Sequence, residues 1–259
     1  MAVQRPTAIS NFAVTYRCNS RCKTCNIWKT EAPEEREMTL NEIHKIFADN
    51  RGFLRDVGSM QITGGESFMR EDLDQIVKTI HCYLPGCRFW IPTNGSTPRT
   101  IEKKTVEILG ALNGIGLGIT VSLDGLKETH DEIRGVKGAY EKAIETLKRL
   151  SAIRETHQNL DLAIGMTVTP ENTGQINSVY QIARSRGAEF SFRPTNISGS
   201  YYGNIGAPLT PPDQADLILP QIRAIGRDLI RRKGLKKSLT SLTYMQGALE
   251  HIREETPEG

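Results

Sequence analysis

Six short apolar runs, each followed by a segment with helical periodicity, dominate this sequence of 259 residues. Branched and aromatic residues in short runs are typical of buried strands, whereas apolar residues spaced three and four apart indicate amphipathic helices. Strands that alternate with helices form parallel sheets through right-handed crossovers. We expect strands at residues 9–16, 57–63, 87–93, 114–123, 160–168 and 188–194, and helices at 39–53, 71–84, 99–112, 139–153, 174–186 and 212–232.

Six such units are two fewer than the eight of a closed TIM barrel. The sequence therefore predicts an α/β fold, a partial (β/α)6 TIM-like barrel with parallel strands, over residues 1–235. Residues 236–259 are expected to be a helical C-terminal tail, which could be the stub of a longer chain. In such barrels the functional residues lie at the carboxyl ends of the strands.

Charge and hydropathy exclude several classes of protein. The 33 Lys and Arg nearly balance the 30 Asp and Glu, so the net charge of +3 indicates no nucleic-acid partner. The sequence contains no apolar run long enough to span a membrane, and residues 1–10 lack the pattern of a signal peptide. We therefore expect a cytoplasmic protein without a membrane partner.

Three of the five cysteines, Cys18, Cys22 and Cys25, follow the first expected strand with the spacing CxxxCxxC. Three thiolates on one short loop can bind one metal centre, and an odd total makes a poor disulfide framework. Four cysteines would saturate a 4Fe-4S cluster, whereas three leave one iron without a protein ligand. The alternatives are a zinc site with a distant histidine and incidental thiols; the nearest downstream histidine, His44, falls inside an expected helix.

Small and polar residues follow the next three strands. Residues 64–66 read Gly-Gly-Glu, in which the glycines permit positive φ and a close backbone approach to a ligand, and the carboxylate can accept from an ammonium. Asn94 ends the third strand, and Ser122 and Asp124 end the fourth. These side chains are expected to offer hydrogen bonds at the mouth of the barrel.

With these motifs at successive strand ends, the chain resembles the radical S-adenosylmethionine (SAM) superfamily over about residues 9–235. It is most similar to the branch whose members often carry C-terminal auxiliary-cluster (SPASM-type) extensions. The resemblance implies a 4Fe-4S cluster on Cys18, Cys22 and Cys25. It also implies SAM as a cofactor, bound by Gly64, Gly65, Glu66, Asn94, Ser122, Asp124, Arg134, Thr24 and Phe192.

The resemblance gives most of these residues a role. The Gly-Gly-Glu motif corresponds to the one that binds the methionine amino group. Ser122 and Arg134 are expected at the SAM carboxylate, and Asn94 and Asp124 along the ribose and carboxylate.

The expected adenine contacts depart from the family pattern in one place. The family commonly has an aromatic residue just before the third cysteine, where this chain has Thr24. Either Trp28 or the backbone at Thr24 would then serve the adenine. Phe192 is expected to reach the mouth of the barrel from the sixth strand, and core packing is the alternative for its ring.

The resemblance implies an oxidoreductase. The reduced cluster passes one electron to SAM, giving methionine and a 5′-deoxyadenosyl radical that abstracts hydrogen from a peptide, a nucleoside or sugar, or another metabolite. A flavodoxin or ferredoxin would supply the electron. An iron-sulfur electron carrier or a structural metal-binding protein is the alternative. The long polar loop at residues 195–212 is expected to be a lid or a substrate contact.

Overall fold

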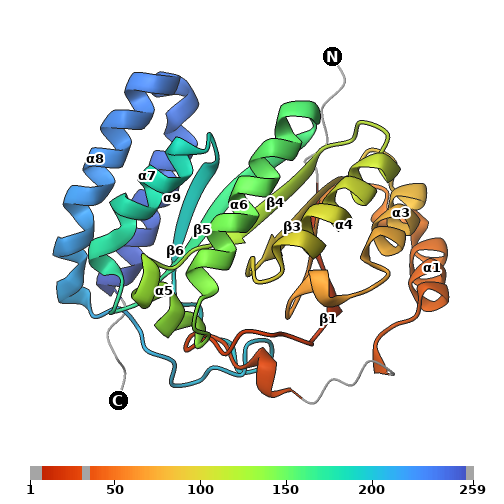
Figure 1. The fold of residues 1–259 in the computed structure, drawn as a ribbon, viewed down its shortest axis with the longest axis horizontal. Coiled ribbons are helices and arrows are strands. Elements are labelled where there is room, and N and C mark those ends of the chain that lie inside the picture. Colours follow the sequence, from red (N-terminus) through yellow and green to blue (C-terminus); the bar gives the residue numbers. More distant parts are fainter. Residues whose placement is uncertain (1–7, 31–35, 255–259) are drawn as a thin grey trace. The chain divides into compact units, whose positions relative to one another are not determined.

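The computed structural model describes residues 8–30 and 36–254 (Figure 1). The expectation that residues 1–10 lack a signal-peptide pattern falls mostly on residues 1–7, which lie outside this range, as do residues 255–259 of the expected tail. Six strands occur in the described residues, in the sheet order β1-β2-β3-β4-β5-β6. They are β1 (Ala8–Thr15), β2 (Val57–Gly64), β3 (Arg88–Thr93), β4 (Leu117–Ser122), β5 (Leu160–Val168) and β6 (Glu189–Pro194).

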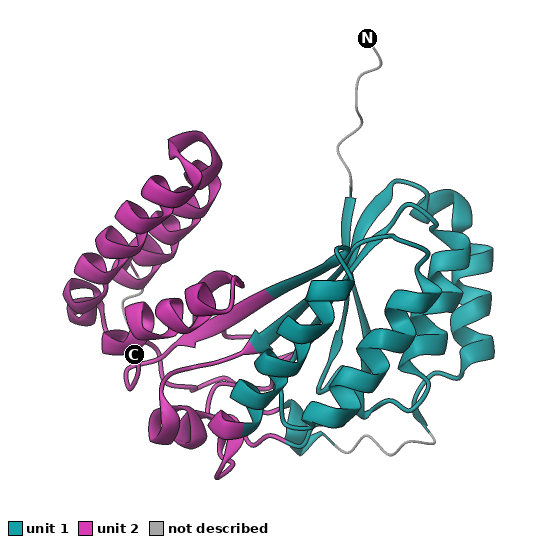
Figure 2. Cartoon of the chain, turned by 45° about the horizontal axis from the view of Figure 1, so that its top comes forward, with its two compact units in different colours: residues 1–19, 27–121, 142–162 teal, residues 20–26, 122–141, 163–259 magenta. Residues whose placement is uncertain are grey.

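The chain divides into two compact units, coloured separately in Figure 2. Unit 1 comprises residues 1–19, 27–121 and 142–162, and unit 2 comprises residues 20–26, 122–141 and 163–259. The cysteine motif is thereby shared, because Cys18 belongs to unit 1 whereas Cys22 and Cys25 belong to unit 2.

Unit 1 contains the parallel pairs β1–β2, β2–β3 and β3–β4. Its helices are α1 (Leu40–Asp49), α2 (Arg51–Leu54), α3 (Leu73–Tyr83), α4 (Pro98–Ala111) and most of α6 (Ala139–Thr156). The expected capping box is present, since Thr39 accepts from the Glu42 amide and the Glu42 carboxylate accepts from the Thr39 amide. The core is made of fully buried side chains such as Ile43, Phe47, Ile62, Ile76 and Phe89.

The first helix ends sooner than expected. The sequence predicts one helix over residues 39–53, but Asn50 separates α1 from α2. The Asn50 amide keeps the helical bond to the Ile46 carbonyl at 3.1 Å, and its side-chain Nδ2 donates to the same carbonyl at 2.8 Å, so Asn50 caps the end of α1. Gly52 then weakens helix propagation beyond this point.

Unit 2 contains the parallel pair β5–β6 and, within the described residues, four complete α-helices. These are α5 (Lys127–Arg134), α7 (Ile176–Ser185), α8 (Ala215–Lys233) and α9 (Leu235–Glu254). Helix α9 packs against α8 and β6 and buries Met245, Leu249 and Ile252. The helix expected in the C-terminal tail is therefore present, and Gly234, at φ 78°, separates it from α8.

Helix α5 was not expected from the sequence. It is eight residues long, strongly polar, and buries only His130 and Ile133, so it lacks a broad apolar stripe. Its end is marked by Gly135, which adopts the left-handed conformation at φ 63°. This helix matters for the site because Arg134 is its last residue.

Candidate functional site

All five cysteines carry thiols rather than disulfide bonds. Cys22 is buried, and Cys18 and Cys25 are half-buried. Within the described residues, no three His, Cys, Asp or Glu side chains surround the position of a single metal ion. A 4Fe-4S cubane makes a different demand, because each thiolate ligates a different iron.

In unit 1, the backbone that leads into Cys18 lies directly against the Gly-Gly-Glu motif. The Gly65 amide donates to the Thr15 carbonyl at 2.8 Å, and the Glu66 amide donates to the Arg17 carbonyl at 2.8 Å. A Cβ on Gly64 would lie 2.0 Å from the Thr15 oxygen, and one on Gly65 would lie 2.2 Å from the Arg17 oxygen. Both positions require glycine for this reason.

The close approach in the structure comes from the protein itself, from the backbone at Thr15 and Arg17. The expectation that the two glycines also admit a ligand stays a prediction. Only Gly64 has a positive φ, of 141°. A close backbone approach within the protein makes the same demand on the residue as a ligand does, so the sequence does not distinguish the two.

A cluster of charged side chains fixes the same segment. Glu37 accepts from Thr15 Oγ1, from Arg17 Nε at 3.0 Å, and pairs with Arg70 Nη1 at 3.4 Å. Arg70 also donates to the Val14 carbonyl at 3.1 Å and forms a bidentate pair with Asp72. Burial raises the pKa of Asp72, but hydrogen bonding and charge from Arg70 outweigh it and leave that pKa below its usual value.

Glu66 is 1 % exposed, and its carboxylate is held by donors from the chain itself. Oε1 accepts from Thr93 Oγ1 at 2.9 Å and from the Phe68 amide at 3.2 Å, and Oε2 accepts from the Asn94 amide at 2.6 Å. Three donors fix the orientation of a buried carboxylate. Such a group is a preorganised acceptor for a cationic ligand.

The side chain of Asn94 continues this network. Its Nδ2 donates to Asn19 Oδ1 at 2.7 Å, and Asn19 Nδ2 donates to Ser96 Oγ at 2.7 Å. Asn94 therefore connects Glu66 to the residue that directly follows Cys18. Sequence analysis missed Asn19, because a polar residue in a loop gives no signal of a partner 75 positions away.

In unit 2, Asp124 and Arg134 form an ion pair of 2.7 Å between Oδ2 and Nη2. Asp124 is 1 % exposed, and its Oδ1 accepts from the Thr167 amide at 2.8 Å. Arg134 Nη1 lies 3.7 Å from Cys22 Sγ, within hydrogen-bonding range for sulfur. The structure thus brings together two of the predicted SAM ligands and one predicted cluster ligand.

The segment around Cys25 is held by the loop at residues 196–204. Asn204 is 1 % exposed, and its Nδ2 donates to the Thr24 and Asn196 carbonyls, both at 2.8 Å. The Asn26 amide donates to the Tyr202 carbonyl at 2.8 Å. Part of the loop expected to be a lid or substrate contact therefore supports the cysteine segment. Asn204 also escaped the sequence analysis.

The remaining residues predicted to contact SAM are Ser122, Thr24 and Phe192, with Trp28 as an alternative at the adenine. Ser122 is half-buried at the end of β4, and Thr24 is half-buried with its carbonyl bound to Asn204. Phe192 is 1 % exposed and its ring lies 6.3 Å from that of Phe190. Trp28 makes a cation–π contact with Lys29. Their roles toward SAM stay predictions.

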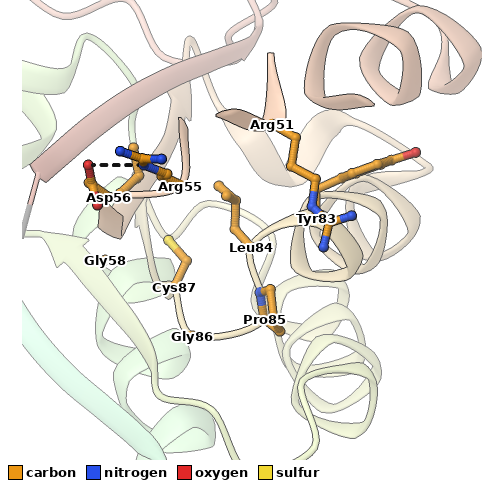
Figure 3. A pocket seen from close by; sticks show the side chains of 10 residues that line it. Arg51, Arg55, Asp56, Gly58, Tyr83, Leu84, Pro85, Gly86 and Cys87 are labelled. Atoms are coloured by element: carbon orange, nitrogen blue, oxygen red, sulfur yellow. Dashed lines mark ion pairs between the residues drawn. The ribbon is translucent and has the colours of Figure 1, made fainter. Parts of the chain in front are cut away.

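A surface cavity lies at the amino-terminal ends of β2 and β3 in unit 1 (Figure 3). It is lined by Arg51, Arg55 and Asp56 before β2 and by Cys87 before β3. Burial raises the pKa of the Cys87 thiol to about 11, so this cysteine is protonated and unreactive at neutral pH. The cavity and Cys87 are separate from the Gly-Gly-Glu end of β2.

A family model described as the Radical SAM superfamily matches residues 12–178, more than half of the chain. This chain belongs to the radical SAM superfamily. The family recognition from the cysteine and Gly-Gly-Glu motifs is confirmed, and a 4Fe-4S cluster and SAM are the cofactors of this superfamily.

Curated relatives of this radical SAM chain are similar over most of its length. It is 28 % identical over 180 residues to the Fe-coproporphyrin III synthase of Methanosarcina barkeri, covering 69 % of this chain and 41 % of the relative. It is 26 % identical over 181 residues to the sporulation killing factor maturation protein SkfB of Bacillus subtilis, covering 70 % and 40 %. The chain thus spans less than half the length of these two relatives.

Solved structures share the fold at low identity. Streptococcus suis SuiB bound to S-adenosylmethionine superposes with a TM-score of 0.63 at 16 % identity, over 88 % of this chain and 48 % of that one. Native anSMEcpe with bound AdoMet gives 0.60 at 16 % identity, over 86 % and 62 %. The partial parallel (β/α)6 barrel predicted for this radical SAM chain is confirmed. No helix within residues 8–30 and 36–254 is both long and apolar enough to cross a membrane.

Proposed function

We propose that this chain is the catalytic barrel of a radical SAM oxidoreductase. In this proposal Cys18, Cys22 and Cys25 hold a 4Fe-4S cluster, and Glu66 receives the ammonium of SAM. When bound, the two cofactors supply a 5′-deoxyadenosyl radical from the reductive cleavage of SAM, and the radical takes hydrogen from a substrate. The protein residues bind and orient the cofactors and exclude water from the reaction.

The observation that carries the proposal is the environment of Glu66. Hydrogen bonds from Thr93, Phe68 and Asn94 hold this buried carboxylate in one orientation. A carboxylate fixed in this way is preorganised to accept a hydrogen bond from an ammonium group. Glu66 follows a segment that is bonded to the residues before Cys18, so an amino acid held there would lie beside the first cluster ligand.

Asp124 fits this proposal as a positioning residue. Both of its oxygens already accept protein hydrogen bonds, from Arg134 and from the Thr167 amide. Ser122 and Asn94 remain candidates for direct contact with the SAM carboxylate and ribose, and Thr24 and Phe192 for contact with the adenine. Gly64 and Gly65 act by letting Glu66 come close to the cysteine segment.

For the substrate we propose a peptide or a small molecule. The names of the relatives include a killing factor maturation protein, heme synthases and GTP 3′,8-cyclases, and SuiB is solved with its precursor peptide SuiA. For the reductant we propose a flavodoxin or ferredoxin. A thiolate-bound iron-sulfur cluster needs a reducing compartment, which favours the cytoplasm.

We further propose that residues 1–235 form the catalytic barrel and residues 236–259 a helical tail. The packing of α9 on α8 and β6 supports a tail that contributes to the fold of unit 2. Its buried residues Met245, Leu249 and Ile252 would otherwise expose apolar surface to water.

The decisive experiment is anaerobic reconstitution of the full protein, followed by incubation with SAM and dithionite. We expect about four irons per chain and slow formation of 5′-deoxyadenosine and methionine even without substrate. Tightly bound zinc without iron uptake would favour a structural metal site. A reducible cluster that produces no 5′-deoxyadenosine would favour an electron carrier.

The variant Glu66→Gln tests the SAM site within the same experiment. It keeps the size of the side chain and one acceptor oxygen but removes the charge. We expect unchanged iron content and SAM affinity weaker by about 1.5–3 kcal/mol, the value of one charge-assisted hydrogen bond. Unchanged SAM affinity, measured by equilibrium binding, would place the ammonium elsewhere. Cys22→Ala is the matched control, in which cluster assembly itself is lost.

A further inference from the structure

The C-terminal end of α5 is bonded to the segment that carries Cys22. The last carbonyls of a helix have no partner inside it. Here the Ile133 carbonyl accepts from the Lys23 amide at 2.9 Å, and the Arg134 carbonyl accepts from the Arg21 amide at 2.8 Å. These two backbone bonds flank Cys22, so they hold the end of α5 beside the cysteine.

The glycine after Arg134 allows this close approach. A Cβ on Gly135 would lie 2.4 Å from the Arg21 carbonyl oxygen, and the residue is left-handed at φ 63°. The loop beyond it is closed by Asp131, whose carboxylate accepts from the Gly138 amide at 2.5 Å and from the Tyr140 amide at 2.8 Å. Any side chain at position 135 would push the helix end away from Cys22.

The guanidinium of Arg134 extends from this fixed backbone toward two acceptors. Nη2 lies 2.7 Å from Asp124 Oδ2, and Nη1 lies 3.7 Å from Cys22 Sγ. The side chain of Arg134 is 13 % exposed, so water screens these interactions weakly. A planar guanidinium can serve both acceptors at once, whereas an ammonium acts as a point charge.

Asp124 is itself held in place from three directions. Its amide donates to His130 Nδ1 at 2.9 Å, its carbonyl accepts from Asn172 Nδ2 at 2.8 Å, and its Oδ1 accepts from the Thr167 amide. The carboxylate therefore cannot follow the arginine if the latter moves. Asp124 fixes the plane of the Arg134 guanidinium and with it the direction of the N–H groups facing the sulfur.

We infer that Arg134 raises the reduction potential of the cluster by donating to the Cys22 thiolate, and that Asp124 is its positioning residue. This inference rests on the proposed function. Reduction adds one electron to the cluster and increases the negative charge on its ligand sulfurs. A cationic donor at one of these sulfurs stabilises the reduced form more than the oxidised form.

The test compares the cluster potential of the wild type with that of Arg134→Gln, by anaerobic redox titration followed by electron paramagnetic resonance, without SAM. We expect the equilibrium constant for reduction to fall about tenfold, which is a shift of about 59 mV to more negative potential for one electron. The iron content of both proteins is measured alongside. An unchanged potential together with weaker SAM binding would overturn the inference and make Arg134 a carboxylate ligand only.

Lys23→Gln is the matched control, since it removes one positive charge from the same segment. Lys23 pairs with Glu132 at 2.7 Å and with Glu171 at 3.2 Å, away from the sulfur contact of Arg134. We expect its effect on the potential to be smaller than that of Arg134→Gln. Equal shifts of the reduction potential in the two variants would mean that net charge alone causes the shift. That result would contradict a specific hydrogen bond from Arg134 to Cys22.

Arg134→Lys covers the case in which Arg134→Gln takes up no iron. The ammonium is expected to stay with the Asp124 carboxylate and leave the sulfur, so the potential should again fall. A wild-type potential in this variant would overturn the inference. A wild-type protein that binds no cluster or cleaves no SAM contradicts the proposed function instead, so the two failures can be told apart.

Discussion

The segment before Cys18 and the segment around Cys22 and Cys25 are anchored by different chemistry. In unit 1, Thr15 and Arg17 are fixed by a buried cluster of charges centred on Glu37. In unit 2, the backbone at residues 21–26 is fixed by neutral hydrogen bonds to α5 and to the loop at residues 196–204. The Gly65 and Glu66 amides also bind the first segment, and the pairs of Lys23 with Glu132 and Glu171 add charge to the second, so the contrast is one of degree. Loss of a charged group should therefore destabilise the first segment more than the loss of an amide destabilises the second.

The largest effect is expected from Glu37→Gln. This change removes the carboxylate that Arg17 and Arg70 share, and although Arg70 keeps its pair with Asp72, loss of a buried charge partner is expected to cost about 3 kcal/mol of unfolding free energy. Chemical denaturation of the iron-loaded protein measures the loss. Asp49→Asn is the control, because its pair with Lys45 is exposed and should contribute nothing measurable. Equal stability of the two variants would refute the importance of the Glu37 cluster.

A smaller loss is expected from Asn204→Ala in unit 2. The change leaves the Thr24 carbonyl and the Ser198 amide without their amide partner, at a cost of about 2 kcal/mol. Asn26→Ala is the matched control, since its bond to the Gly203 carbonyl is exposed and should be worth less than about 1 kcal/mol. Iron retention after chelator treatment should decline in the same order. The reverse order would show that the loop does not support Cys25.

The smallest effect is the pH dependence of the unfolding free energy, which is expected to differ between the two segments. His130 is fully buried, and burial, with the charge of Arg134 as a second cause, lowers its pKa to about 3. It faces Tyr140 and the Asp124 amide. The folded protein therefore binds fewer protons at this residue than the unfolded chain. Its contribution to stability is complete above the unfolded pKa of about 6.5 and is lost progressively toward pH 3.

Because His130 binds a proton in the unfolded but not in the folded protein, a change from about pH 7 to about pH 6 should lower the unfolding free energy by about 0.7 kcal/mol. His130→Gln should flatten the slope, as measured by denaturation at a series of pH values. In the Glu37 cluster, Asp72 has a lowered pKa, so its contribution is present above the usual carboxyl pKa and is lost only in stronger acid. A wild-type slope in His130→Gln would assign the titration to another group.

The sequence predicted the architecture because strands and helices leave a periodic record of burial. All six expected strands are present with bounds within three residues, and the cysteines, Glu66 and Asn94 lie at strand ends as expected. Helix α5 escaped because it is short and polar, and the break at Asn50 escaped because a cap made by one asparagine side chain leaves no periodic signal. These are local failures of periodicity.

The chain's own pattern determined which residues are available for chemistry: three thiols on one loop, a Gly-Gly-Glu turn and polar strand ends. Only the tertiary structure decided their partners. It set the two glycines against the backbone at Thr15 and Arg17, the guanidinium of Arg134 against Cys22 and Asp124, and Asn204 against a carbonyl 180 positions away. Periodicity reports which side chains are buried, whereas a hydrogen-bond partner depends on the path of the chain between them, and that path is set by the packing of the whole unit.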